Sequence, residues 1–349
     1  MDNNNNNTTG NTRQSGPDLI RTFACIFVVG AHFYLNMGYY DTPMEGAKMA
    51  VMTSLRWLFL TAVPLFFMLT GYFKKNKKAD RAHYMALVQL VIAYVVISVG
   101  KMILYNHLYG KIYGIKEIFA NLGNYQIAWY MGLYLCVFLL IPFLNKAWYA
   151  LDEREQNILL LTLVFLCTIY PVFNYIAPSY FIGTYPVLFY FFGIAVRDRN
   201  IKVNKLLLFA ALIITILIET LITMKCTRTG VFDWNLISTP DTYGTIFITI
   251  CTLCVFLMFY DVDIRSKVIR RLLSSISGVS FEIYLFAGAY DAIIYSIVKR
   301  YVNGTANEAF WYFLITVPAS FICAYISSVV FRSVVLFATG ILSRASKEG

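Results

Sequence analysis

The sequence is poor in charged residues and in features that mark soluble or secreted domains. Only 14% of its 349 residues are Asp, Glu, Lys or Arg, whereas 59% are hydrophobic. A soluble domain carries about 25% charged residues, so a water-soluble fold is a poor fit. The seven cysteines are scattered, which argues against a disulfide scaffold. Cys251 and Cys254 lie one helical turn apart with no His nearby, which is typical of packing residues, so we expect no metal site.

A removable signal peptide and an internal repeat are also lacking. Residues 1–17 are polar and rich in Asn, so we expect a disordered tail. They contain no charged segment, short apolar core and small-residue cleavage site in succession. The first apolar helix is therefore expected to stay in place as an anchor. The two inverted halves that build many transporters are not visible in the sequence.

Long apolar runs are abundant instead. Runs such as 88–99 and 206–221 are nearly uncharged and apolar on every face, which suits a helix in lipid. The sequence therefore predicts an all-α, polytopic transmembrane bundle of about ten helices over 18–340, followed by a short cytoplasmic tail at 341–349. Pro318 could kink or break the last helix, which is long for one crossing. With a window of about 19 residues, the predicted spans are 18–40, 50–73, 83–106, 125–145, 156–176, 179–196, 204–224, 243–260, 279–298 and 309–337.

The loops between these spans alternate between a basic set and a less basic set. Lys and Arg favour cytoplasmic loops, so the basic set is predicted to face the cytoplasm. Arg13, Arg344 and Lys347 place both termini on that side. The net charge of +10 then needs no nucleic acid to explain it, and we expect none as a partner. The basic set is Lys74, Lys75, Lys77, Lys78, Arg81, Lys146, Arg154, Arg197, Arg199, Lys202, Lys205, Arg265, Lys267, Arg270 and Arg271, and the opposite set is Lys48, Lys101, Lys111, Lys116, Lys225, Arg228, Lys299 and Arg300.

The first predicted helix carries Asp18, Arg21 and His32, which lipid should disfavour. At about 100° per residue, Arg21 and His32 point to one face and lie about 16 Å apart along the axis. Arg21 would lie at the cytoplasmic interface and His32 near the middle of the membrane, which suits the two ends of an extended ligand. Histidine is a natural proton acceptor at cellular pH. Alternatively, Arg21 reaches lipid headgroups and His32 bonds to a neighbouring helix.

A second candidate cluster follows the second span. Lys78 and Arg81 would share a helix face if the third helix starts early, and they could clamp anionic phosphates. Positive charge that holds a cytoplasmic loop inside explains the cluster equally well. For the other ionisable residues within spans, the expected role is pairing inside the bundle; these residues are Arg56, Glu219, Glu282 and Asp291.

In the order and spacing of several segments, the chain resembles the integral membrane acyltransferase 3 family. The family's first helix carries a basic residue followed after ten residues by His, as Arg21 and His32 do here. Further similar segments are VPLFFMLTGYF (63–73), AWYMGLYLCVFLLIPFLN (128–145, with Trp129), FFGIAVRDR (191–199) and ISGVSFEIYLFA (276–287, with Glu282 and Tyr284). The resemblance covers nearly the whole membrane region.

Two positions depart from the family's pattern. Lys78 and Arg81 stand where the family often has paired Arg, so the charge is kept without the two-point Arg fork. Near Tyr284, Leu285, Phe286 and Ala287 occupy the stretch where a second His is frequently seen. A mechanism that relies on that second His is therefore not expected here.

The resemblance implies transfer of an acyl group, commonly acetyl, from cytoplasmic acyl-CoA to a hydroxyl of a cell-envelope glycan or lipid-linked sugar, in a bacterial plasma membrane. His32 would act as general base or transient acyl carrier, and no tightly bound cofactor is expected. A secondary transporter or small-molecule uptake module is the alternative, because the same buried ionisable groups could form a proton or anion pathway. The donor phosphates would be held by Arg21, Lys78 and Arg81, with Asp18, Trp129, Glu282 and Tyr284 in support.

Overall fold

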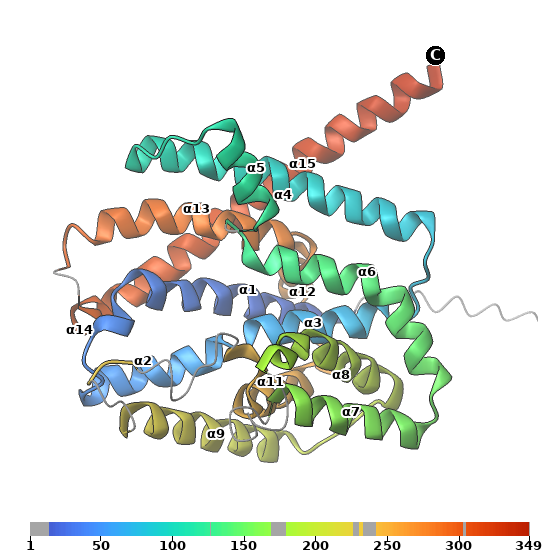
Figure 1. Cartoon of the computed structure of the whole chain (residues 1–349), viewed down its shortest axis with the longest axis horizontal. Coiled ribbons are helices and arrows are strands. Elements are labelled where there is room, and N and C mark those ends of the chain that lie inside the picture. The colour runs from blue at the N-terminus through green and yellow to red at the C-terminus, as the bar shows by residue number, and fades with distance from the viewer. Residues whose placement is uncertain are drawn as a thin grey trace, which may run out of the picture.

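The computed structural model describes residues 14–125, 127–168, 179–225, 230–232, 242–302 and 305–348, with side chains up to residue 335 except at 179, 180, 182 and 242. Helices make up most of this part of the chain, and it contains no strand (Figure 1). Most of the tail at 1–17, with Arg13, and also Arg228 lie outside the described residues.

The helices are α1 (Ser15–Asn36), α2 (Gly46–Phe59), α3 (Ala62–Lys74), α4 (Arg81–Tyr109), α5 (Ile115–Gly123), α6 (Trp129–Ala150), α7 (Glu153–Thr168), α8 (Tyr185–Arg199), α9 (Lys205–Lys225), α11 (Ile246–Phe259), α12 (Lys267–Gly278), α13 (Ser280–Val298), α14 (Ala306–Ala309) and α15 (Phe313–Glu348).

Seven helical segments of the described chain are long and apolar enough to cross a membrane, and α11 is a shorter apolar helix. Large apolar side chains such as Leu206 and Leu207 on α9 and Ile103 on α4 are exposed, as a lipid-facing surface requires. The predicted class, an all-α transmembrane bundle, is confirmed. Each of the ten predicted spans contains a helix. The number of crossings and the cytoplasmic placement of both termini stay predictions.

The second predicted span is divided into two helices. α2 ends at Phe59 and α3 begins at Ala62, and the hydroxyl of Thr61 donates to the carbonyl of Leu58 at 2.6 Å. Pro64 lies in the first turn of α3, where its missing N–H breaks no bond of that helix. The proline therefore explains why the break falls just ahead of it.

Two helices, α5 and α12, lie outside the predicted spans. α12 packs on α1 and buries Leu273 and Ile276, while Val268 and Leu272 stay exposed. A short helix with separate apolar and basic faces is suited to the membrane surface. At the other end of the chain, α15 continues through Pro318 as far as Glu348, so most of the predicted tail is helical.

The basic loops meet at one end of the bundle, which we call the basic end and define as residues 75–80, 151–152, 200–204 and 261–266 (Figure 1). An ion pair between Lys75 and Asp198 joins the first of these loops to α8. Another, between Lys205 and Asp261 at 2.8 Å, joins the start of α9 to the last of these loops. The hydroxyl of Ser15, at the start of α1, donates to the carbonyl of Val262 at 3.1 Å. α1 therefore enters the bundle from the basic end.

α3 and α8 approach each other closely through glycine. A Cβ added to Gly71 would overlap the carbonyl of Tyr190, and one added to Gly193 would overlap the carbonyl of Met68. Small residues allow two backbones to touch in this way within a membrane. Because α1 packs against α3, this contact sets the frame on which the polar residues of α1 are held.

Candidate functional site

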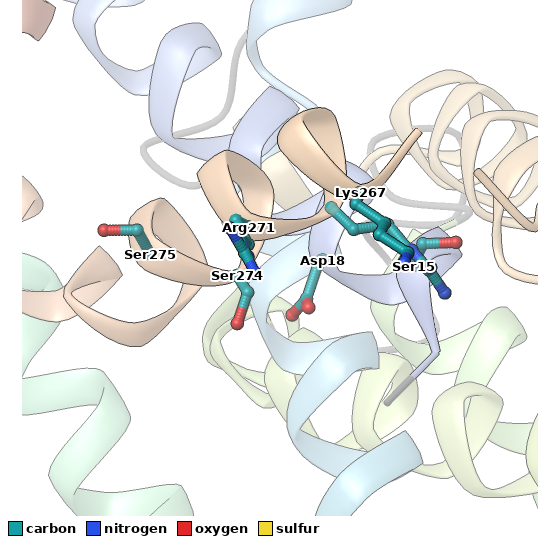
Figure 2. Close-up of a pocket in the computed structure, with 7 residues that line it drawn as sticks. Ser15, Asp18, Lys267, Arg271, Ser274 and Ser275 are labelled. Carbon is teal, nitrogen blue, oxygen red and sulfur yellow. The ribbon is translucent and has the colours of Figure 1, made fainter. Parts of the chain in front are cut away.

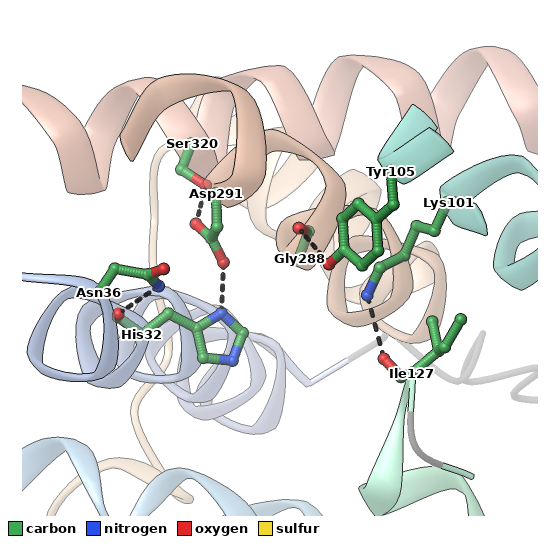
Figure 3. Close-up of polar contacts among 8 residues, drawn as sticks. All are labelled: His32, Asn36, Lys101, Tyr105, Ile127, Gly288, Asp291 and Ser320. Carbon is green, nitrogen blue, oxygen red and sulfur yellow. Dashed lines mark hydrogen bonds and ion pairs between the residues drawn. The ribbon is translucent and has the colours of Figure 1, made fainter. Parts of the chain in front are cut away.

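His32 of α1 is paired with a buried carboxylate of α13. Its Nδ1 lies 2.6 Å from Oδ2 of Asp291, and Ser320 of α15 donates its hydroxyl to Oδ1 of the same carboxylate at 2.6 Å (Figure 3). Asp291 is only 4% exposed. A carboxylate accepts hydrogen bonds, so Nδ1 carries the proton and Nε2, on the other side of the ring, is the basic nitrogen.

The end of α1 is fixed close to this pair. Asn36, four residues after His32, donates its side-chain amide to the carbonyl of His32 at 2.8 Å (Figure 3). The bond adds a side-chain donor to a main-chain carbonyl one turn before the end of α1. His32 is thus held from both its side chain and its main chain.

A buried cation lies beside the pair. Lys101 of α4 donates its ammonium to the carbonyl of Ile127 at 3.0 Å and packs directly over Gly288, one turn from Asp291 on α13 (Figure 3). Lys101 also interacts electrostatically with Asp291. Sequence reasoning counted Lys101 with the charges of the less basic side, but the side chain is 7% exposed and turned into the bundle.

Arg21 and His32 open into two neighbouring cavities. The cavity beside His32 has a volume of about 60 Å³, and the cavity beside Arg21 has a volume of about 150 Å³. Phe66, Tyr130 and Tyr284 line both, so the two cavities share a wall. One face of α1 therefore presents a guanidinium and an imidazole to adjoining spaces.

Arg21 is held inside the protein. Its Nη1 donates to the hydroxyl of Ser277 on α12 at 2.7 Å, and its guanidinium lies 5.0 Å from the ring centre of Phe73. Lys74, whose ammonium packs over Phe138, interacts electrostatically with Arg21. Two cations that interact in this way favour the binding of an anion nearby.

Aromatic residues at the start of α6 form the wall above His32. The main-chain N–H of Tyr130 donates to the hydroxyl of Tyr284 at 3.1 Å, and the two rings meet edge to face at 5.3 Å. Trp129 stacks on Tyr243 at 5.4 Å and lines the His32 cavity. Tyr284 thus serves as a capping acceptor for α6, a task that the sequence did not reveal.

The other predicted residues lie elsewhere. Lys78 and Arg81 are exposed at the basic end and line none of the cavities described above. Glu282 is paired with Arg332 at 3.5 Å. Asp18 is buried and lines a separate cavity beneath α12. The structure therefore brings together Arg21, His32, Trp129 and Tyr284, but not the remaining four.

At the end of the bundle opposite the basic end, a larger cavity of about 580 Å³ lies beyond the last turn of α1. Its lining includes Tyr34, Asn36, Tyr40 and Asp41, and it shares Leu35 with the His32 cavity. Cavities therefore follow α1 from the Arg21 level to its far end. Among the described residues, no three His, Cys, Asp or Glu side chains are grouped as metal ligands would be.

Sequence reasoning missed the partners of His32. Asp291 drew notice as an acid within an apolar segment, but its partner lies 259 positions away, and only the packing of α13 on α1 joins them. Ser320 gave no signal, because a serine within a membrane helix is common.

Comparison with known proteins adds one finding. A family model described as an acyltransferase domain matches residues 14–329, from the start of α1 into α15. No curated protein and no solved structure shows a significant match.

Proposed function

The chain belongs to the acyltransferase 3 family, and we propose that this membrane acyltransferase moves an acetyl group from cytoplasmic acyl-CoA to a hydroxyl of a cell-envelope glycan or lipid-linked sugar. The observation that carries the proposal is the His32–Asp291 pair, which opens on a cavity next to that of Arg21. It supports the proposal because an imidazole and a guanidinium lie on one helix, about 16 Å apart along the axis, as a long phosphorylated thioester would need.

His32 is proposed to work as a general base. Nε2 takes the proton of the acceptor hydroxyl while that oxygen attacks the thioester carbonyl. The carbon–sulfur bond then breaks, and the imidazolium returns the proton to the departing thiolate, so that free CoA and the new ester result. Asp291 holds the ring and stabilises the imidazolium without taking the proton itself. A base of this kind contributes about 100- to 10,000-fold in rate.

A second form of the proposal has His32 accept the acyl group before the acceptor arrives. Nε2 then attacks the thioester directly and CoA leaves as the thiolate. In a second step the acceptor hydroxyl attacks the acyl carbon, the carbon–nitrogen bond breaks, and the hydroxyl proton is released to water, where it protonates the thiolate. Both forms need Nδ1–H bound to Asp291, since that bond makes Nε2 the nucleophilic or basic nitrogen. A burst of free CoA in the absence of acceptor distinguishes the second form from the first.

The donor is proposed to arrive at the basic end, where a CoA thioester from the cytoplasm meets Arg21. The axial rise from Arg21 to His32 is about 16 Å. Lys78 and Arg81 lie exposed at this end, where they favour the approach of an anionic donor. The proposal therefore has the basic end face the cytoplasm of a bacterial cell, with both termini on that side of the plasma membrane.

The acceptor is proposed to bind at the opposite end, in the cavity beyond α1. Aromatic rings, an amide and a carboxylate suit a hydroxyl-rich sugar, and Tyr34, Asn36 and Asp41 supply these groups. The neighbouring His32 cavity would then receive the reacting hydroxyl from this side.

His32→Ala tests the proposal in membrane vesicles supplied with labelled acetyl-CoA. We expect transfer of label to the glycan fraction to be abolished while the purified protein still folds and unfolds cooperatively, at a lower temperature because Asp291 loses one of its two hydrogen bonds. His107→Ala is the matched control, because His107 is exposed and lines none of these cavities. Near-normal transfer by His32→Ala would refute the catalytic assignment.

A transporter is the second candidate, favoured by the cavities that follow α1 toward both ends. Proteoliposomes separate the two functions when proton-coupled flux and thioester cleavage are measured in one preparation. Cleavage without flux supports the acyltransferase, and flux without cleavage supports the transporter.

A further inference from the structure

A cavity at the basic end lies between α1 and α12, apart from the two cavities beside Arg21 and His32. Its volume is about 550 Å³, within the range of cavities that hold small organic ligands. α1 contributes Ser15 and Asp18 to it (Figure 2). α12 contributes Lys267, Arg270, Arg271, Ser274 and Ser275.

The basic face of α12 is separate from its lipid-suited face. At about 100° per residue, the five cavity-lining residues fall within an arc of about 140°. The exposed apolar residues Val268, Ile269 and Leu272 fall within a different arc of about 100°. Cations that served only lipid headgroups would lie along the edges of the apolar face. Here they face the cavity instead, which favours a ligand that enters from the aqueous side.

The charge of the cavity suits a polyanion. Three cations face a single carboxylate, Asp18, so the lining keeps an excess of positive charge. Two of the cations are guanidinium groups, which bind phosphate oxygens in pairs, and the serine hydroxyls add further donors. A lone carboxylate among three cations also limits their mutual repulsion when the cavity holds no anion.

α12 connects this cavity to Arg21. Ser277, seven residues after Arg270, accepts the hydrogen bond from Arg21. Seven residues correspond to about 10 Å along the helix, and the route continues along α1 to His32. A ligand with phosphates at one end and a reactive group on a long arm matches this order of groups.

We infer that the cavity between α1 and α12 binds the phosphate-bearing nucleotide end of the acyl-CoA donor through Lys267, Arg270 and Arg271. The inference rests on the proposed function. It assigns the binding of the phosphates to residues of α12. Lys78 and Arg81, which the resemblance suggested for this role, lie exposed on another segment and line no part of this cavity.

The test uses the full chain in nanodiscs of phosphatidylcholine, with adenosine 3′,5′-bisphosphate and CoA as probes. The variant K267Q/R270Q/R271Q removes the three cations. The variant K146Q/R154Q/K202Q is the control, because it removes three exposed positive charges, on α6, α7 and the loop before α9, that line none of these cavities. We expect the first variant to bind both probes at least tenfold more weakly, and the control to stay within twofold of the wild type.

Three results would overturn the inference. The first is unchanged binding of both probes by K267Q/R270Q/R271Q. The second is equal weakening in the two triple variants, which would reveal only a long-range effect of charge. In the third, K267Q/R270Q/R271Q binds both probes as tightly as the wild type does but is no longer stabilised by phosphatidylglycerol. That result would make the ligand a lipid headgroup. If the triple variant fails to fold, R271Q alone, at an exposed position, is expected to weaken binding about threefold or more, and unchanged binding by R271Q overturns the inference.

Failure of the inference and failure of the proposed function give different results. A wild-type protein that neither binds CoA nor cleaves acetyl-CoA contradicts the proposed function. A wild-type protein that transfers acetyl, with a donor KM that K267Q/R270Q/R271Q leaves unaltered, contradicts the inference alone.

Discussion

Nδ1 of His32 and Oδ2 of Asp291 lie 2.6 Å apart across two helices that are 259 positions apart in the sequence. An unpaired Asp in the middle of a membrane helix costs about 2.5–3.5 kcal/mol. The hydrogen bonds from His32 and Ser320 satisfy both oxygens of this carboxylate. Three helices, α1, α13 and α15, are thereby tied together at the level of the proposed chemistry.

Asp291→Asn tests whether this pair serves the reaction. The amide keeps the shape of the carboxylate but does not stabilise an imidazolium, so we expect kcat to fall by about 100-fold or more with the donor KM unchanged. Ser320→Ala removes one hydrogen bond to the carboxylate, and we expect a smaller fall, about tenfold. Single-turnover transfer from labelled acetyl-CoA measures both. A rise in donor KM without a change in kcat would show that Asp291 serves binding instead.

The sequence was sufficient to select His32 as a candidate site residue, but not to show that Asp291 is its partner. His32 stood out because its spacing from Arg21 follows from helical geometry alone. Asp291 was visible only as a costly residue, since its partner depends on how α13 packs against α1. Lys101 lay inside the predicted span 83–106 but was counted with the less basic side, because a count of charges does not show that its side chain turns into the bundle. The periodicity of a single helix can be predicted from the local sequence, whereas contacts between helices depend on the whole fold.

Arg21→Lys tests the binding of the donor. An ammonium keeps the charge but loses the planar group that donates to Ser277 and stacks on Phe73. We expect the donor KM to rise about fivefold to tenfold, with kcat within twofold of the wild type. Initial rates over a range of acetyl-CoA concentrations give both values. A fall in kcat at unchanged KM would mean that Arg21 acts on the reacting atoms.

Tyr284→Phe tests the capping of α6. The substitution removes the acceptor of the Tyr130 N–H and keeps the ring contact, so we expect a loss of stability of about 1 kcal/mol. Thermal unfolding in detergent measures the loss. Tyr301→Phe is the control, because Tyr301 is 73% exposed. Equal unfolding temperatures for Tyr284→Phe and the control would contradict the assigned role.

The fold shows the same division between local and distant information. Apolar runs located a helix in every predicted span, because hydropathy is a local property. The break between α2 and α3 was not predicted, although Pro64 was present, since a proline in a first turn is compatible with an unbroken run of apolar residues. α12 was taken for a loop because its basic residues dominate a window average, while its two faces become distinct only when it lies on α1.

The contact between α3 and α8 yields a prediction about stability. Gly71→Ala places a methyl group on the main-chain carbonyl of Tyr190. A main-chain carbonyl cannot move aside by changing rotamer, as a side chain can. Glycine to alanine within a helix normally gains up to about 1 kcal/mol. We expect a net loss of about 3 kcal/mol or more instead, because α8 must move away from α3.

Gly100→Ala on α4 is the matched control for this substitution, since an added Cβ there meets nothing within 4 Å. It should keep the gain of up to about 1 kcal/mol that alanine brings to a helix. Gly193→Ala, on the other side of the same contact, should behave like Gly71→Ala, and the double variant should lose less than the sum, because one separation of the helices relieves both overlaps. Thermal unfolding of the four variants in one detergent decides the matter. Strictly additive losses would show that the two glycines pack independently.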